Sequence, residues 1–154
     1  MSPVLLIVTF LLTSLIAGLF GGAAMEFVMW LISRAGWASG NMIVALGSLI
    51  TKSRENAFRV GAIVHAISAV GFAAVYAMLM LILGLTHLPL SLMLGLGVGA
   101  LHGMLVSLML VWIVSESHPL PEFKEAGVEV GLSHFVGHVA YGGVVGLVVG
   151  LSPL

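Results

Sequence analysis

The sequence predicts an all-α membrane protein built as a four-transmembrane-helix bundle. Of its 154 residues, 60% are hydrophobic and only 7% are charged, against about 25% charged in ordinary soluble domains. The mean hydropathy is +1.23, so the chain has too few polar side chains to cover a surface that faces water. Lipid is therefore the expected environment, and four separate apolar runs supply the helices.

Four segments reach the length of about 20 apolar residues that a helical span requires. They cover residues 4–32, 58–85, 90–114 and 130–151, and we expect one transmembrane domain over residues 1–154. Transmembrane β-strands are excluded because each run is continuously apolar rather than alternating. Sliding the first span onto the third pairs Gly21 with Gly103 and Trp30 with Trp112, so two tandem helical hairpins are one arrangement that the sequence allows.

The basic residues predict how the chain is oriented. All five lie in the segments that join span one to span two and span three to span four: Arg34, Lys52, Arg54, Arg59 and Lys124. Because cytoplasmic loops are enriched in Lys and Arg, we expect both of these loops in the cytoplasm. Both termini would then lie outside the cell (inner) membrane.

The two longer loops carry opposite charge. The first has four basic residues and Glu55, whereas the second has Lys124 and four glutamates, Glu116, Glu122, Glu125 and Glu129. We expect the loops to meet through weak surface salt bridges; an acidic funnel that attracts cations is the alternative. An apolar stretch in the first loop, residues 40–51, is too short to span and predicts a short interfacial helix, with Trp37 as its anchor.

Glycine recurs at every fourth position in three of the spans. Small residues let helix backbones approach closely in lipid, where little hydrophobic force drives helices together. We therefore assign the glycine-bearing faces to the interior of the bundle. The rows are Gly18 and Gly22, then Gly95, Gly99 and Gly103, then Gly142, Gly146 and Gly150.

Ionisable residues within the spans fall on or beside these interior faces. They are Glu26, His65, His102, His134 and His138. Such groups are costly in hydrocarbon and tend to pair with one another or line functional sites. A carboxylate with several imidazoles is also the ligand set with which helix bundles hold iron, manganese, zinc or copper. We therefore predict a transition-metal site formed by Glu26, His65, His134 and His138, with His102 as a deeper fifth member.

Other interpretations of these histidines stay open. Each imidazole can instead hydrogen-bond a neighbouring hydroxyl or backbone carbonyl. Alternatively, imidazoles on different helices, such as His65 and His138 or the deeper His102, can ligate the iron of haem b. Room for the flat macrocycle would then come from nearby glycines, namely Gly61, Gly99, Gly103 and Gly137.

Methionines and loop histidines receive simpler assignments. The nine methionines are interpreted as fillers of irregular apolar gaps, although thioethers also suit Cu(I). His87 and His118 lie in loops and are expected to be solvated.

Composition also excludes several functions. Cysteine is absent, so disulfides, thiolate metal sites and a cysteine nucleophile are excluded. The net charge of −1 gives no electrostatic footprint for nucleic acid. No nucleotide-binding loop or serine-nucleophile motif is present, so an enzyme is the less favoured class.

Several short motifs resemble small bacterial four-helix membrane proteins of uncharacterised function. They are residues 42–48, His65 with Gly71-Phe72-Ala73 and Tyr76, Leu101-His102-Gly103, and Gly137-His138-Val139-Ala140-Tyr141-Gly142. This chain has Ile43 after Met42, where those proteins often have Asp. The resemblance implies the four-helix fold and a histidine in spans two, three and four, and it implies no activity.

Three classes of function follow. The first is a membrane protein that binds a transition metal or haem for metal handling or electron transfer, as part of a larger complex or a homo-oligomer. The second is a structural or assembly subunit without a cofactor, motivated by the glycine rows. The third, less favoured, is a proton-coupled carrier that uses Glu26 and the histidines as relay groups.

Overall fold

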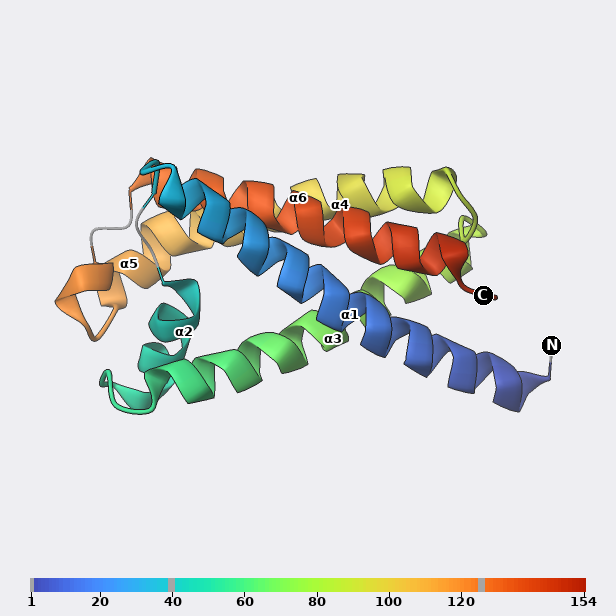
Figure 1. Cartoon of the computed structure of the whole chain (residues 1–154), viewed down its shortest axis with the longest axis horizontal. Coiled ribbons are helices and arrows are strands. Elements are labelled where there is room, and N and C mark those ends of the chain that lie inside the picture. The colour runs from blue at the N-terminus through green and yellow to red at the C-terminus, as the bar shows by residue number, and fades with distance from the viewer. Residues whose placement is uncertain (1, 39–40, 125–126) are drawn as a thin grey trace.

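The computed structural model describes residues 2–38, 41–124 and 127–154. Its helices are α1 (Pro3–Arg34), α2 (Met42–Thr51), α3 (Ala57–Leu83), α4 (Leu90–Met109), α5 (Ser115–Ser117) and α6 (Val128–Leu151). A π-helical segment, Leu110–Val114, joins α4 to α5, and a 3₁₀ turn, Pro121–Phe123, precedes α6. The described residues contain no strand, which confirms the all-α prediction (Figure 1).

Four helical stretches are long and apolar enough to cross a membrane, as predicted. They are Pro3–Arg34, Ala57–Leu83, Leu90–Ser117 and Val128–Leu151. The third is three residues longer than predicted because the chain stays helical through the π segment to Ser117. Its polar end, Ser115–Ser117, looked like loop in the sequence, but the Ser115 and Ser117 hydroxyls bond carbonyls one turn back.

Local sequence explains where several of these helices begin and end. Pro3 occupies the first turn of α1, and the Ser2 side chain accepts a hydrogen bond from the Leu5 amide. Asn41 caps α2 in the same way through the Val44 amide. Gly84 ends α3 with a φ of 68°, a left-handed conformation that glycine adopts without steric cost.

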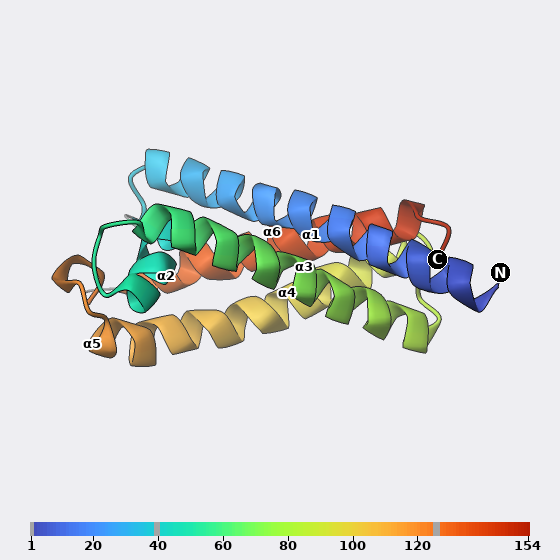
Figure 2. The same cartoon turned by 90° about the horizontal axis from the view of Figure 1, so that it is seen from below.

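The spans run up and down, and both termini lie at the same end of the molecule (Figures 1 and 2). α4 packs on α6, α1 packs on both α3 and α6, and α3 touches α4 only slightly. α6 therefore contacts both α4 and α1, and α1 packs on α6 at least as extensively as on α3. The arrangement as two tandem hairpins stays a prediction.

Glycines of all three rows lie at close helix contacts, as the four-residue spacing predicted. A methyl group on Gly18 would lie 2.5 Å from the Val70 Cα on α3, and one on Gly99 would lie 2.5 Å from the His138 carbonyl oxygen on α6. Real side-chain carbons do not approach backbone atoms so closely. The glycine rows thus fix which faces touch, and all three rows are used inside the chain.

The outer surface of the helices is apolar. Large side chains such as Ile82 and Leu151 are more than 70% exposed, and many others along all four spans are more than half exposed. A continuous exposed apolar surface of this kind fits contact with lipid tails rather than water. The core between the helices is small, with Ala17, Ala73 and Met80 fully buried.

The short helix predicted in the first loop is present as α2; residues 39–40 lie outside the described part of the chain. It packs against α3, because Gly47 on α2 and Gly61 on α3 let the two backbones touch. α2 therefore belongs to the folded molecule at the end opposite the termini.

Candidate functional site

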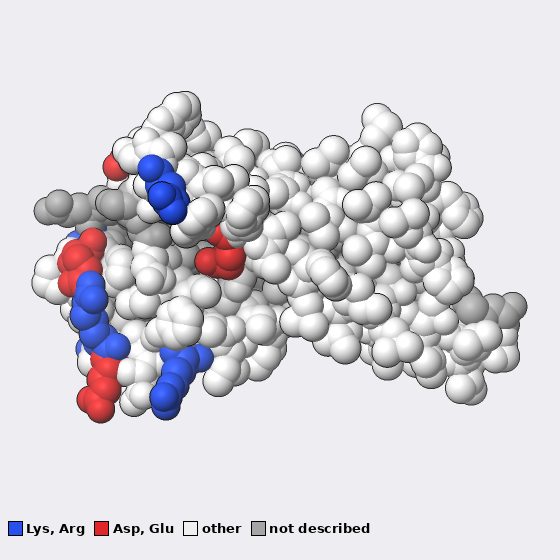
Figure 3. Space-filling view, viewed as in Figure 1, with Lys and Arg blue, Asp and Glu red and all other residues white. Residues whose placement is uncertain are grey.

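Charged side chains gather at the end of the molecule where α2 lies (Figure 3). There the Arg54 Nε donates a hydrogen bond of 2.6 Å to the Glu122 carboxylate, joining the two longer loops. This hydrogen bond holds the pKa of Glu122 below its ordinary value. The expectation that the loops meet is confirmed, and because both side chains are exposed the ion pair adds little stability. Glu125 lies outside the described residues.

His118 is buried, with 1% of its surface exposed, so the expectation that it is solvated is wrong. The Leu120 amide donates to His118 Nδ1 at 3.1 Å, and the His118 Nε2 lies 3.2 Å from the Ala45 carbonyl oxygen on α2. With Nδ1 accepting, Nε2 carries the proton and donates to that carbonyl. Its loop position concealed this role, because the contact with α2 is distant in sequence. His87, by contrast, is exposed.

Glu26 on α1 and His65 on α3 form the first pair of ionisable residues between the candidate spans. The Glu26 Oε1 lies 3.7 Å from the His65 Nε2. This separation is too long for a hydrogen bond, and within the described residues the buried Glu26 Oε1 has no hydrogen-bond partner. The Glu26 carboxyl group and the His65 imidazole thus face each other without a hydrogen bond between them.

His102 on α4 and His138 on α6 form the second pair. Their ring centroids lie 4.6 Å apart with the planes at 67°. The Tyr76 hydroxyl on α3 lies 3.1 Å from the His102 Nδ1, and the Phe72 ring packs on His102 at a centroid distance of 4.3 Å. Tyr76 and Phe72 were noted in the sequence only as part of a resemblance, since nothing local shows that they face α4.

The α6 histidines bond their own helix. His138 Nδ1 lies 2.7 Å from the His134 carbonyl oxygen, and His134 Nδ1 lies 2.8 Å from the Val130 carbonyl oxygen. A carbonyl only accepts, so Nδ1 is the protonated nitrogen in both rings and Nε2 keeps its lone pair. For His134 and His138 this geometry confirms the interpretation in which an imidazole bonds a backbone carbonyl through its Nδ1.

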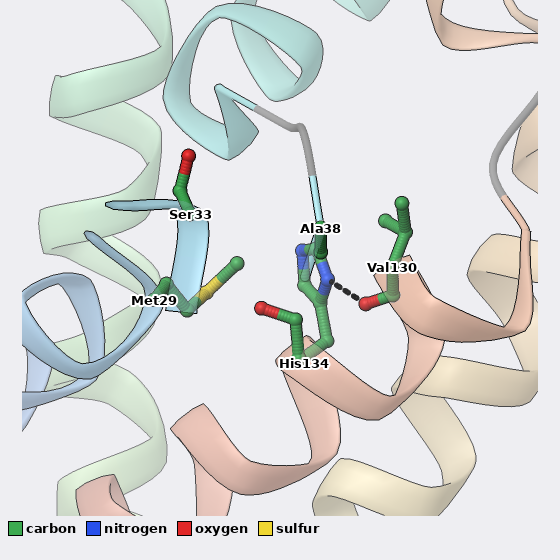
Figure 4. A pocket seen from close by; sticks show the side chains of 6 residues that line it. Met29, Ser33, Ala38, Val130 and His134 are labelled. Carbon is green, nitrogen blue, oxygen red and sulfur yellow. Dashed lines mark hydrogen bonds between the residues drawn. The ribbon is translucent and has the colours of Figure 1, made fainter. Parts of the chain in front are cut away.

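His134 projects into a small cavity at the end of the bundle near α2 (Figure 4). The cavity has a volume of about 10 Å³ and is bordered by Met29, Ser33 and Ala38. This is about the space of one water molecule. Among the described residues, the His134 Nε2 finds no hydrogen-bond partner.

The five predicted ligands therefore do not converge. In residues 2–38, 41–124 and 127–154, no three His, Asp or Glu side chains lie close enough to share a metal ion. Instead they form the pair Glu26–His65, the pair His102–His138 and the separate His134. Depth along the spans was predictable from residue number, but the sequence does not show which side of each helix faces which neighbour.

Protein atoms fill the space beside each of the four glycines that were named for a haem pocket. The α6 backbone lies against Gly99 and Gly103, the Ile43 carbonyl of α2 lies against Gly61, and Met25 and Met29 lie against Gly137. Met25 and Met29 thus fill the gap that glycine leaves, as predicted for methionine. At Gly99 and Gly103 the backbones of α4 and α6 are in contact.

Comparisons with known proteins add no family: no protein-family model, curated protein or solved structure matches the chain. The fold and the site define a class, a small all-helical protein with four candidate membrane spans and polar pairs between them. The resemblance to bacterial four-helix proteins stays a prediction.

Proposed function

We propose that the chain is an integral membrane protein that binds one transition-metal ion between α4 and α6. The protein ligands are the Nε2 atoms of His102 and His138. The observation that carries this proposal is the 4.6 Å between the two imidazole centroids, on helices that no short stretch of sequence connects. Two imidazoles so close in an apolar surrounding are unusual unless they pair or share a ligand.

The hydrogen bonds of the Nδ1 atoms in both rings support this assignment. Metal-binding histidines usually engage their second nitrogen with a carbonyl, hydroxyl or carboxylate, which fixes the tautomer and the ring orientation. Here Tyr76 engages the Nδ1 of His102, and the His134 carbonyl engages the Nδ1 of His138. In the proposed site each Nδ1–H donates, that of His102 to the Tyr76 hydroxyl oxygen and that of His138 to the His134 carbonyl, so that each Nε2 keeps the lone pair that binds the metal.

The helix packing supports a rigid site. Gly99 and Gly103 bring α4 into backbone contact with α6 beside His138, so the two helices that carry the imidazoles are held close together. Pre-positioned ligands lose little freedom on binding. The same contact favours a bare ion over haem b, since it leaves no space for a porphyrin.

The imidazole ligands limit which metals the site can bind. Imidazole suits zinc, copper and iron, whereas manganese prefers carboxylate and water oxygens. Of the four metals that the sequence suggested, the proposal therefore keeps zinc, copper and iron. The ion serves metal handling or electron transfer within a bilayer, with both longer loops in the cytoplasm and with other membrane subunits or further copies as partners.

Elemental analysis of the purified protein tests the proposal. We expect about one zinc, copper or iron ion per chain, and loss of most of it in His102→Gln and His138→Gln. His87→Gln is the matched control because His87 is exposed and lies in the turn between α3 and α4. Stripping the metal with a chelator should lower the melting temperature of wild type and of the control, because an ion bound only by the folded chain stabilises it. Treatment with the chelator should leave the melting temperatures of His102→Gln and His138→Gln unchanged.

Two results would contradict the proposal. One is wild-type protein that takes up none of the three metals after reconstitution and whose melting temperature does not respond to them. The other is a metal content that His102→Gln and His138→Gln leave intact. The first result would favour a structural subunit without a cofactor, and a Soret absorption band would favour haem.

A further inference from the structure

A second feature of the bundle is a cavity between α1 and α3. Its volume is about 190 Å³ and its lining includes Gly18, Gly22, Ala66 and Ala69, with Glu26 and His65 as its polar members. The two helices touch at Gly18 and Val70, and Figure 1 shows them crossing and then diverging toward the end where α2 lies. Glu26 and His65 follow Gly18 and precede Val70 on that diverging side.

The cavity opens outward. Leu19 and Ala23, which also line it, are exposed, and Glu26 keeps about a third of its side chain exposed. Glu26 lies eight residues before Arg34 and His65 lies six residues after Arg59, which is about 12 and 9 Å along the helix axes. In a bilayer whose boundary is marked by these arginines, the opening faces hydrocarbon. A ligand would therefore arrive from the lipid phase.

Glu26 and His65 determine which polar group such a ligand would carry. A hydroxyl group placed between the two side chains can donate its proton to the Glu26 carboxyl oxygen and accept the N–H of His65. It would satisfy the buried Glu26 Oε1, which now has no partner among the described residues. While Glu26 is ionised, a carbonyl group could use only the imidazole, because it has no proton to donate to a carboxylate.

The apolar walls specify its shape. Gly18, Gly22, Ala66 and Ala69 carry at most one methyl group each, so they present smooth surfaces that suit a flat ring. The volume is below the roughly 300 Å³ at which pockets for larger ligands begin, which suits a single ring with its tail left in the lipid.

We propose that the cavity between α1 and α3 binds the hydroxyl-bearing ring of a membrane-dissolved hydroquinone, with Glu26 and His65 as its hydrogen-bond partners. This binding uses neither His102 nor His138. It therefore stands whether or not those residues hold a metal ion.

The test measures binding of decylubiquinol, a short-tailed hydroquinone, to the full chain in nanodiscs under argon after metal removal. We expect saturable binding that weakens at least about tenfold for the oxidised form, since only a hydroxyl donates to Glu26. Glu26→Leu and His65→Leu should each weaken binding of the hydroquinone by a similar factor, and Ala66→Leu should block it by filling the cavity. Gly71→Leu is the matched control on α3, because no other residue lies within 4 Å of a methyl group at Gly71.

Three outcomes would overturn the proposal. The first is absence of saturable binding by wild type in nanodiscs that pass a circular-dichroism check for helix content. The second is binding that Glu26→Leu and Ala66→Leu leave unchanged. The third is equal displacement of decylubiquinol by decanol, which would assign the cavity to an aliphatic lipid rather than to a ring.

Discussion

Gly97 and Gly99 stand two positions apart on α4 and have opposite surroundings. A methyl group on Gly99 would lie 2.5 Å from the His138 carbonyl oxygen, whereas no other residue lies within 4 Å of a methyl group on Gly97. The same residue type therefore has a packing role at one site and none at the other. Only Gly99 belongs to a row with four-residue spacing.

These surroundings predict opposite effects of alanine. Gly99→Ala should lower stability by about 1–3 kcal/mol, because backbone atoms of α6 must move to admit the methyl group. Gly97→Ala should leave stability unchanged or raise it by up to about 1 kcal/mol, since alanine favours the helix. Thermal or denaturant unfolding in mild detergent measures both. Equal destabilisation by the two variants would contradict the α4–α6 contact.

Single residues also show where sequence reasoning stops. The spacing of Gly95, Gly99 and Gly103 identified an interior face, because the period of a helix is fixed by its geometry. It did not identify α6 as the neighbour, since that depends on tertiary packing. The closeness of His102 to His138 was missed as a separate pair for the same reason: depth along a span is readable, but rotation about its axis against another helix is not.

At the level of elements, α2 is held in place by more than its apolar face. Its Gly47 meets α3, and its Ala45 carbonyl accepts a hydrogen bond from His118 in the loop before α6. At the surface, Arg54 in the turn after α2 forms an ion pair with Glu122 in the loop before α6. α2, through Ala45, and the turn after it, through Arg54, thus make these contacts between the two longer loops.

His118 should control how firmly α2 is attached. His118→Leu keeps an apolar side chain in the buried space but removes both hydrogen bonds, leaving the Leu120 amide without its acceptor. The cost should be about 1–3 kcal/mol, seen as faster hydrogen exchange in α2 while exchange in α4 and α6 is unchanged. His87→Leu, at an exposed position in the opposite turn, should have no effect on exchange in α2. Unchanged exchange in His118→Leu would contradict the role given to this imidazole.

The elements themselves were largely predictable. Apolar runs of span length predicted all four long helices because a helix in lipid must satisfy its own backbone. The sequence predicts an end of the third span three residues too early, because the serines that extend it are polar and typical of loops. The packing of α2 on α3 was not predicted, since it depends on Gly47 and Gly61, which belong to no four-residue row.

For the whole molecule, α6 packs on both α4 and α1, and α1 also packs on α3, whereas α3 barely touches α4. The termini share one end, and the charged loops share the other (Figures 1 and 3). Charge therefore differs between the two ends of the molecule. The orientation proposed in a membrane depends on this asymmetry, because basic loops stay in the cytoplasm.

Cysteine labelling can test that orientation without background, because the chain contains no cysteine. Glu55→Cys and Lys124→Cys place a thiol on each longer loop, and Ser2→Cys and His87→Cys place one at the other end; all four positions are exposed. In intact cells, a membrane-impermeant maleimide should label the thiols at positions 2 and 87, and should reach those at 55 and 124 only after permeabilisation. The reverse pattern would invert the orientation while keeping the fold. Labelling of position 55 and position 124 from opposite sides would contradict the four-span arrangement itself, because an even number of crossings must separate these two loops.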